Sequence, residues 1–229
     1  MRFPRNTQFD EQFASIPDIA WYPYVGEHFE SVPRRVMVFA HNIPVHTEHY
    51  DERKSQWKSK TYWADCIEEY TYCRGTWTEA FRFFLKAACG LRGNYDASSD
   101  ALITNRVDAF VRSIAYLNFI QDLVKSPGSL ANADASQVSI SRRVNRRIVS
   151  ILGITHCICW GVQVFRHVIA MDGFRVISRE SLPLQGFSVA VVEDDRGRQM
   201  RVLRIFHPSM PKFRPYSVET QRVIADFLK

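Results

Sequence analysis

The sequence has little of what marks several large classes of protein. One uncharged stretch, residues 148–165, is long enough to suggest a membrane span, but it contains Gly153, His156 and Gly161, whereas a span needs about 20 predominantly apolar residues. Residues 1–10 are polar and charged, where a secretory signal requires an apolar core. Only five of the 229 residues are cysteine, an odd number in a chain too long to depend on disulfides. We therefore expect a cytoplasmic protein that does not enter the membrane.

The signatures of common nucleotide-binding and hydrolytic enzymes are also missing. Neither G-x-G-x-x-G nor G-x-x-x-x-G-K-[ST] occurs, so nothing indicates a dinucleotide or nucleoside triphosphate ligand. No G-x-S-x-G motif occurs either, and Ser209 lies too near His207 in the sequence to be the usual nucleophile for that histidine. The sequence therefore predicts no organic cofactor and no Ser-His-Asp hydrolase.

What the chain does contain is typical of one folded domain. Apolar residues make up 46% of it and aromatic residues 13%, which is too rich for a disordered chain. Thirty lysines and arginines against 24 acidic residues leave a net charge of +6, which permits a polyanionic partner without requiring one. We predict a single monomeric domain over residues 1–229. Residues 1–33 are rich in proline and aromatic side chains, and we interpret them as an irregular N-terminal wrap over the core.

Short apolar runs alternate with amphipathic helical patterns along the chain. Continuous apolar or β-prone runs predict strands at residues 36–40, 115–119, 156–160, 188–192 and 201–206. The spacing of apolar residues predicts helices at residues 76–91, from 105, at 136–152, at 162–170 and after Ser217. Residues 41–75 show no clear period, and we interpret them as a long loop with at most a short helix. The alternation predicts a layered α/β fold with a mostly parallel sheet.

Polar residues follow three of the predicted strands. His41 and Asn42 come directly after the first strand, Asn118 stands at the end of the second, and His207 follows the last. Ligands of open α/β sheets bind beyond the carboxyl ends of the strands. We therefore expect two amides and an imidazole to converge on one edge of the sheet.

The segments AHNIP (40–44), AYLN (115–118) and FHPSM (206–210), in that order, resemble the uracil-DNA glycosylase superfamily. HCICWG (156–161) is similar to the apolar strand of that family that ends in glycine before a helix. The resemblance runs from residue 34 to the C-terminus, and its most specific part is the HPS segment. It implies a three-layer α/β/α sandwich with a mostly parallel central sheet. It also implies hydrolysis of the N-glycosidic bond of a damaged or mismatched, uracil-type base extruded from single- or double-stranded DNA.

The resemblance assigns roles to individual residues. Asn42 matches the residue that positions the attacking water; as in the mismatch-specific branch, an amide orients water but cannot take its proton. Asn118 matches the amide that reads the edge of the flipped base, and we predict His41 as a second base-binding residue. His207 matches the imidazole that stabilises the departing base anion. Ser209, Met210 and Pro211 match the loop that inserts an apolar wedge into the base stack.

Several positions depart from the family pattern and leave alternatives open. Ala40 replaces the glycine of the first motif, and Ile43-Pro44 replaces the usual Pro-Tyr or Pro-Gly pair. The aromatic residue that stacks on the base is not identified among its candidates, which are Tyr50, Trp57, Tyr62 and Trp63. These departures favour an alternative function, a catalytically weak or inactive module that binds nucleic acid or a base-like ligand. A plain protein-interaction domain is a third possibility.

Two further groups of residues bear on ligands. Arg142, Arg143, Arg146 and Arg147 share one helix face, which we interpret as solvated rather than as a phosphate contact. The cysteine spacings, with six residues between Cys66 and Cys73 and one between Cys157 and Cys159, do not fit the CxxC pair of iron–sulfur members of the superfamily. His46 and His49 lack a third ligand at a suitable spacing. The sequence therefore predicts no metal.

Overall fold

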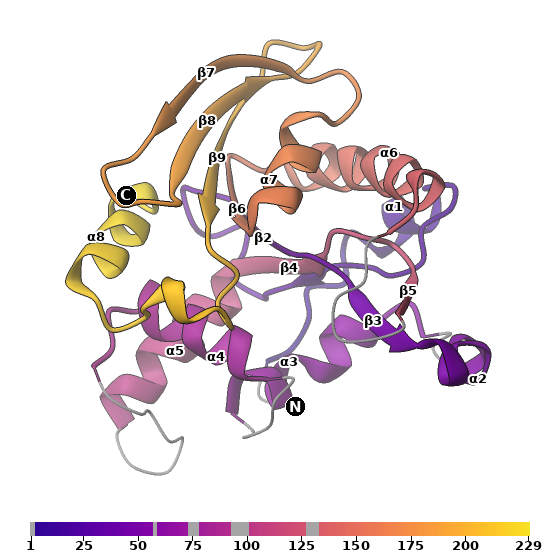
Figure 1. Ribbon diagram of the computed structural model, residues 1–229, viewed down its shortest axis with the longest axis horizontal. Coiled ribbons are helices and arrows are strands. Elements are labelled where there is room, and N and C mark those ends of the chain that lie inside the picture. The colour runs from indigo at the N-terminus through magenta and orange to yellow at the C-terminus, as the bar shows by residue number, and fades with distance from the viewer. Residues whose placement is uncertain (1–2, 57–58, 73–77, 93–100, 127–132) are drawn as a thin grey trace.

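The computed structural model describes residues 3–56, 59–72, 78–92, 101–126 and 133–229. Its main sheet contains seven strands in the order β1-β4-β2-β6-β9-β8-β7. Figure 1 shows the sheet between two layers of helices, with α3, α4 and α5 on one side and α6 and α7 on the other. The structure thus confirms a mixed α/β fold with a parallel core flanked by helices.

Four parallel strands form the centre of the sheet. These are β4 (Ile114–Asn118), β2 (Val36–Ala40), β6 (His156–Trp160) and β9 (Gln199–Ile205), paired in that order. Every residue of β2, β4 and β6 is buried, because helices cover both faces of the sheet. The apolar runs that predicted these strands therefore reflect burial on two sides, and the predictions are confirmed.

Antiparallel strands extend the sheet at both edges. β1 (Tyr24–Val25) pairs with β4, while β8 (Ser188–Glu193) and β7 (Arg175–Ser181) continue beyond β9. The β8–β9 hairpin confirms the prediction made from its two apolar runs. The sequence did not predict β7, because all seven of its residues are exposed and it has no buried face to create a period of two.

The helices follow from their buried stripes and capping residues. They are α3 (Tyr62–Tyr72), α4 (Glu79–Ala88), α5 (Ala101–Ser113), α6 (Ala135–Leu152), α7 (Val162–Ile169) and α8 (Val218–Phe227). Asp134 forms a capping box with Gln137 at the start of α6, and Gly153 ends that helix at φ +60°. The Ser217 hydroxyl accepts the Thr220 N–H and starts α8, as predicted. Thr76, the predicted start of the helix before Gly90, lies outside the described residues.

The interpretation of residues 41–75 as a long loop is wrong. This region contains β3 (Ile43–His46), a 3₁₀ turn η1 (Thr47–His49) and the helices α2 (Tyr50–Gln56) and α3. β3 pairs in parallel with β5 (Leu123–Ser126) in a second, two-stranded sheet. The strand has only four residues and depends on its partner for stability, so its local sequence carries little signal.

The N-terminal segment contains little regular structure but several buried aromatic side chains. Among its described residues, the regular elements are α1 (Asp10–Ala14) and β1, whereas Phe3, Phe13 and Phe29 are fully buried. Large apolar side chains therefore hold this irregular backbone in place. Within the described ranges, no helix combines the length and apolar character needed to cross a membrane.

Candidate functional site

The carboxyl ends of the parallel strands bring the predicted site residues to one edge of the sheet. Ala40 and Asn118 are register partners at the ends of β2 and β4. Beyond them, the Phe119 N–H donates to the Ala40 carbonyl at 2.8 Å, and the Ile120 N–H donates to the His41 carbonyl at 3.0 Å. β2 has β4 on one side and β6 on the other, and the chain crosses from β4 to β6 past β2. The direction in which strands are added therefore reverses at β2, and α/β sheets bind ligands at such a switch point.

Asn118 is a buried residue whose carboxamide has no hydrogen-bond partner among the described residues. The residue is 5% exposed, and no described residue forms a hydrogen bond with its side chain. Its polar atoms nevertheless keep contact with solvent, unlike the sealed indole nitrogen of Trp160. Water can satisfy this carboxamide in the free protein, so a ligand that displaces the water has to supply matching hydrogen-bonding groups. One donor and one acceptor side by side match the edge of a nucleobase.

The nearby Gln121 is a structural amide by contrast. Its side-chain oxygen accepts the N–H groups of Ala20 at 3.3 Å and Trp21 at 3.1 Å, which ties the N-terminal wrap to the loop after β4. Its backbone N–H donates to the Ser141 hydroxyl on α6 at 2.9 Å. The two amides therefore differ, because only Asn118 keeps its hydrogen-bonding capacity for another molecule.

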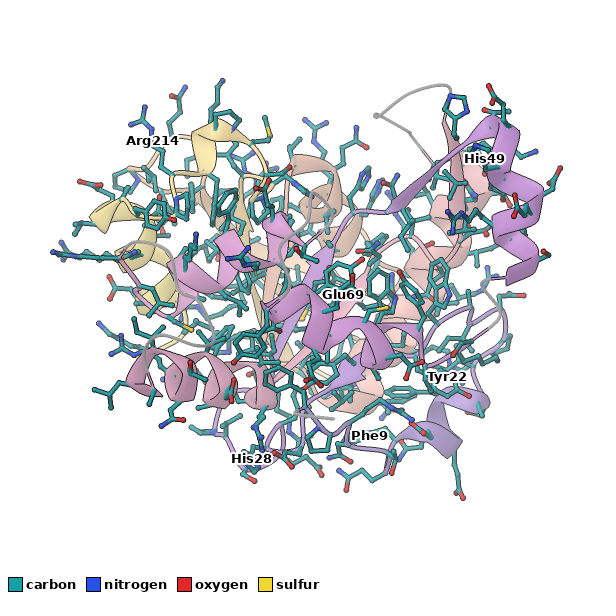
Figure 2. All side chains as sticks on the ribbon, turned by 90° about the horizontal axis from the view of Figure 1, so that it is seen from below. Phe9, Tyr22, His28, His49, Glu69 and Arg214 are labelled. Atoms are coloured by element: carbon teal, nitrogen blue, oxygen red, sulfur yellow. The ribbon has the colours of Figure 1, made fainter. Side chains whose placement is uncertain are left out.

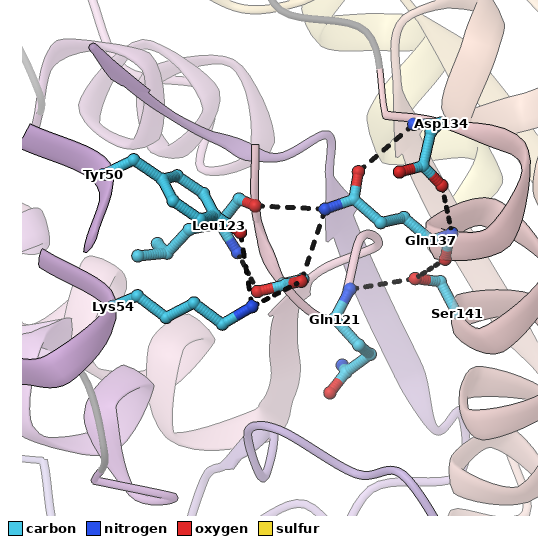
Figure 3. Close-up of polar contacts among 8 residues, drawn as sticks. Tyr50, Lys54, Gln121, Leu123, Asp134, Gln137 and Ser141 are labelled. Carbon is cyan, nitrogen blue, oxygen red and sulfur yellow. Dashed lines mark hydrogen bonds and ion pairs between the residues drawn. The ribbon is translucent and has the colours of Figure 1, made fainter. Parts of the chain in front are cut away.

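A polar network anchors the loop that follows Asn118 (Figure 3). The Gln137 amide of α6 donates to the Leu123 carbonyl at 3.1 Å and to the Asp122 carboxylate at 3.3 Å. From the other side, Lys54 of α2 contacts Asp122 at 3.5 Å. Because α6 and α2 both hold this loop, Asn118 sits on a rigid platform.

His207 is held as a neutral imidazole with its proton on Nε2. Its Nδ1 accepts the backbone N–H of Ser209 at 3.3 Å and lies 2.7 Å from the Ser209 hydroxyl. An Nδ1 that accepts an N–H carries no proton, so Nε2 is the donor. Burial, and then the nearby His41, lower the pKa of His207 to about 4. The imidazole is therefore uncharged near neutral pH and presents one N–H donor.

His41 and His167 join His207 in a cluster of three imidazoles. His41 directly follows β2, which lies between β4 and β9 in the sheet, and it contributes to the lowered pKa values of both other imidazoles. His167, on α7, stacks on the Phe119 ring at 5.5 Å, and its Nδ1 lies 3.2 Å from the guanidinium of Arg142. Sequence reasoning missed His167, because a histidine in a helix after a Gly turn has no distinguishing pattern. It placed Arg142 on a solvated helix face, whereas the structure brings the Arg142 guanidinium to His167.

The buried histidines predict a loss of stability in acid. The pKa values of His156, His167 and His207 are lowered to about 4 in the folded chain, first of all by burial. Their unfolded values stay near 6.5, so the unfolded state binds more protons between about pH 6.5 and pH 4. The free energy of unfolding should therefore fall as the pH falls through this window, with proton uptake approaching one per imidazole.

Urea unfolding at a series of pH values measures this effect. The His156→Gln variant, which removes one imidazole away from the candidate site, should show a shallower dependence on pH. The His28→Gln variant is the control, since that side chain is 57% exposed. A midpoint that stays constant from pH 7 to pH 4.5 would contradict the lowered pKa values.

Asn42 and the Ser209–Pro211 loop lie at the same edge. Asn42 is half-buried in the connection between β2 and β3. The Met210 N–H donates to the His207 carbonyl at 2.8 Å, which closes a tight turn, and the Met210 side chain is 44% exposed. Pro211 then opens the turn η2 (Pro211–Phe213), which the fully buried Phe213 anchors. The loop thus exposes an apolar side chain beside His207, as a wedge requires.

The candidates for the aromatic residue that stacks on the base differ in how deeply the structure buries them. Trp63 is wrong for this role, because it is 1% exposed and packs edge-to-face on Trp21 and Tyr116 in the core. Tyr50 is also buried, with the ammonium groups of Lys54 and Lys125 over its ring. Tyr62 is half-buried and packs edge-to-face on Trp63, and Trp57 lies outside the described residues.

No cluster suited to a metal ion occurs among the described residues, where three or more His, Cys, Asp or Glu side chains never come together in that way. Cys157 and Cys159 lie side by side on β6, with their sulfur atoms 3.7 Å apart. Cys73 is outside the described residues. His46 and His49 have ring centres 6.3 Å apart, and Figure 2 shows His49 at the outer margin of the molecule.

The arginine face of α6 mostly contacts the chain itself. Arg143 pairs with Asp18 at 2.8 Å, and Arg146 pairs with Asp194 at 3.4 Å and with Asp195. Arg146 also lines a cleft of about 510 Å³ next to the β8–β9 turn. Because β9 begins at this turn, the cleft lies at the end of the sheet opposite to the candidate site. These contacts agree with a structural and solvated helix face.

Comparison of the chain with models of known protein families and with curated proteins gave no match. The geometry of the edge of the sheet, together with the three motifs, therefore carries the functional proposal.

Proposed function

We propose that the chain binds a nucleobase extruded from DNA and hydrolyses its N-glycosidic bond, in the manner of a uracil-DNA glycosylase. The main support is a pair of unused hydrogen-bonding groups at one edge of the sheet. These groups are the carboxamide of Asn118 and the Nε2–H of neutral His207. Asn118 ends β4 and His207 follows β9, two strands that are separated by three strand spacings of about 4.8 Å each.

In the proposed reaction, a water molecule oriented by the Asn42 carboxamide attacks the anomeric carbon of the extruded nucleotide. The bond from this carbon to the base nitrogen breaks, and its electron pair leaves with the base. Negative charge develops on the base oxygen, where a neutral Nε2–H of His207 would donate a hydrogen bond. One proton of the water passes to solvent or to the departing base. Asn118 holds the base by its edge throughout.

The proposed partner is DNA, and several features of the chain support it. The net charge of +6 favours a polyanion. The exposed Met210 next to His207 supplies an apolar side chain that can enter the base stack. The cytoplasmic location, the monomeric state and the finer uracil-DNA glycosylase topology remain predictions from the sequence.

A second candidate function is base binding without cleavage. Asn42 favours it, because a carboxamide cannot accept the proton of the attacking water as a carboxylate would. This module would use the same Asn118 and His207 contacts and would release the base unchanged.

An oligonucleotide assay tests both functions. Single- and double-stranded substrates carrying uracil, hypoxanthine or a mismatch are incubated with the protein and then treated with alkali, which cuts the strand wherever a base is missing. We expect cuts that disappear in Asn118→Ala and persist in Asn105→Ala, an exposed asparagine on α5. Salt-dependent binding without cuts would support the module. Neither cuts nor binding at low salt would contradict both functions.

A further inference from the structure

Three arginines converge on the sheet face beneath α7, next to the candidate site. Arg204 of β9 lies opposite Ser188 of β8, and two residues earlier Val202 lies opposite Ala190, which is paired with Arg179 of β7. Directly opposed residues of antiparallel strands project from the same face, as do residues two apart along a strand. Arg204, Arg179 and Ser188 therefore share one face.

Helix α7 contributes Arg166 and also contacts Arg179 of β7. The guanidinium of Arg179 lies over the ring of Phe165, 5.3 Å from its centre. Phe165 is buried, and the adjacent Arg166 is exposed. Burial, and then the positive charges of Arg179 and Arg166, lower the pKa of Arg204, in keeping with the position of Arg204 next to both cations.

Nothing in the described part of the chain compensates these charges. Arg166, Arg179 and Arg204 form no ion pair there, whereas the neighbouring Arg175 of β7 pairs with Glu193 at 2.7 Å. The Nε of Arg204 and the hydroxyl of Ser188 are both buried without a partner. Repelling cations and unsatisfied buried donors destabilise a fold, and an anion supplies both the charge and the acceptors that are missing.

We propose that Arg166, Arg179 and Arg204, together with Ser188, bind a phosphate group. Guanidinium groups recognise phosphate through paired N–H donors, and the serine hydroxyl adds another. The source of the phosphate rests on the proposed function: a DNA strand whose base enters the candidate site. Arg204 lies near the carboxyl end of β9 on the α7 side of the sheet, whereas His207, three positions later, packs on Trp160 on the α4 side. In this proposal the phosphate therefore belongs to a part of the same DNA strand that continues around this end of the sheet, away from the extruded base.

Thermal unfolding with inorganic phosphate, compared with chloride at equal ionic strength, tests the site itself. Phosphate should raise the Tm of the wild type and of Arg196→Gln, a control in the β8–β9 turn at the far end of the hairpin. It should not raise the Tm of Arg204→Gln or of Arg179→Gln. Without phosphate, Arg179→Gln should be at least as stable as the wild type, because one repelling charge is gone. An equal phosphate effect in all four proteins, or none in the wild type, would overturn the proposal.

A single-stranded oligonucleotide without a target base tests the source of the phosphate. In Arg179→Gln and Arg204→Gln, the dependence of log affinity on log salt should become less steep by about one contact, while Arg196→Gln keeps the wild-type slope. If these two variants lose the effect of phosphate on Tm but keep the wild-type salt dependence of oligonucleotide binding, the site binds a free phosphate ligand and the proposal that DNA supplies the phosphate is overturned. Binding of this oligonucleotide does not require cleavage. If the salt dependence changes as expected but the protein cleaves no substrate, only the proposed hydrolysis of the N-glycosidic bond is contradicted.

Discussion

Replacing Asn42 with aspartate should raise the rate of base excision by about a hundredfold or more. The substitution adds a carboxylate of nearly the same size to the half-buried connection after β2. A positioned general base contributes about 10²–10⁴ in rate, because it removes the proton from water as the new bond forms. The measurement is single-turnover cleavage with protein in excess over the oligonucleotide, which separates the chemical step from binding.

The pH profile of Asn42→Asp provides a further check. A carboxylate acting as a base is active only when ionised, so the gain should be lost as the pH falls through the pKa of the new side chain. Asn105→Asp makes the same chemical change at an exposed position of α5 and should leave the rate unchanged. Binding of the substrate by Asn42→Asp with no gain in rate would rule out a water-positioning role for residue 42.

Removing the imidazole of His207 should lower the rate by about 10²–10³. This is the typical cost of losing one preorganised donor to a developing anion. The loss should occur both in the wild type and in the faster Asn42→Asp background, where a fall of this size is easier to measure. Single-turnover rates of His207→Ala provide the test, and His28→Ala, which removes an exposed imidazole, is the control.

The pH dependence distinguishes a neutral donor from a charged one. Because the pKa of His207 is lowered to about 4, the imidazole is already neutral at pH 5 and stays so at pH 8. The His207-dependent part of the rate should therefore not decline as the pH rises through this range. A decline with a midpoint near 6.5 would show that the imidazolium is the active form, contrary to the hydrogen bond from the Ser209 N–H.

The residues of the candidate site could be proposed from the sequence because each lies at or just after the end of a strand that the sequence also predicts. The runs VMVFA and HCICW are buried on both faces, so local composition was enough to identify β2 and β6. Asn118 ends β4, and His207 follows β9. Their shared location then follows from the rule that parallel strands end at one edge.

The residues that the sequence did not reveal depend on contacts between distant segments. His167 reaches the candidate site only because α7 packs near the residues after β4, where the His167 ring stacks on Phe119. Trp63 was a candidate for base stacking, yet the same aromatic ring serves the core once α3 folds against Trp21 and Tyr116. The period of an element predicts which face is buried, but not which neighbour that face will meet.

The amino-acid sequence by itself determined the parallel strands, most helices and the polar residues at the ends of the strands. These depend on burial patterns and capping residues within about 20 positions of the chain. Only the tertiary structure decided which polar groups stay unsatisfied. Within the described part of the chain, the Asn118 carboxamide has no hydrogen-bond partner whereas that of Gln121 does, and Arg204 has no ion pair whereas Arg175 does. A hydrogen bond or ion pair requires both partners in place, and these partners come from segments far apart in the sequence.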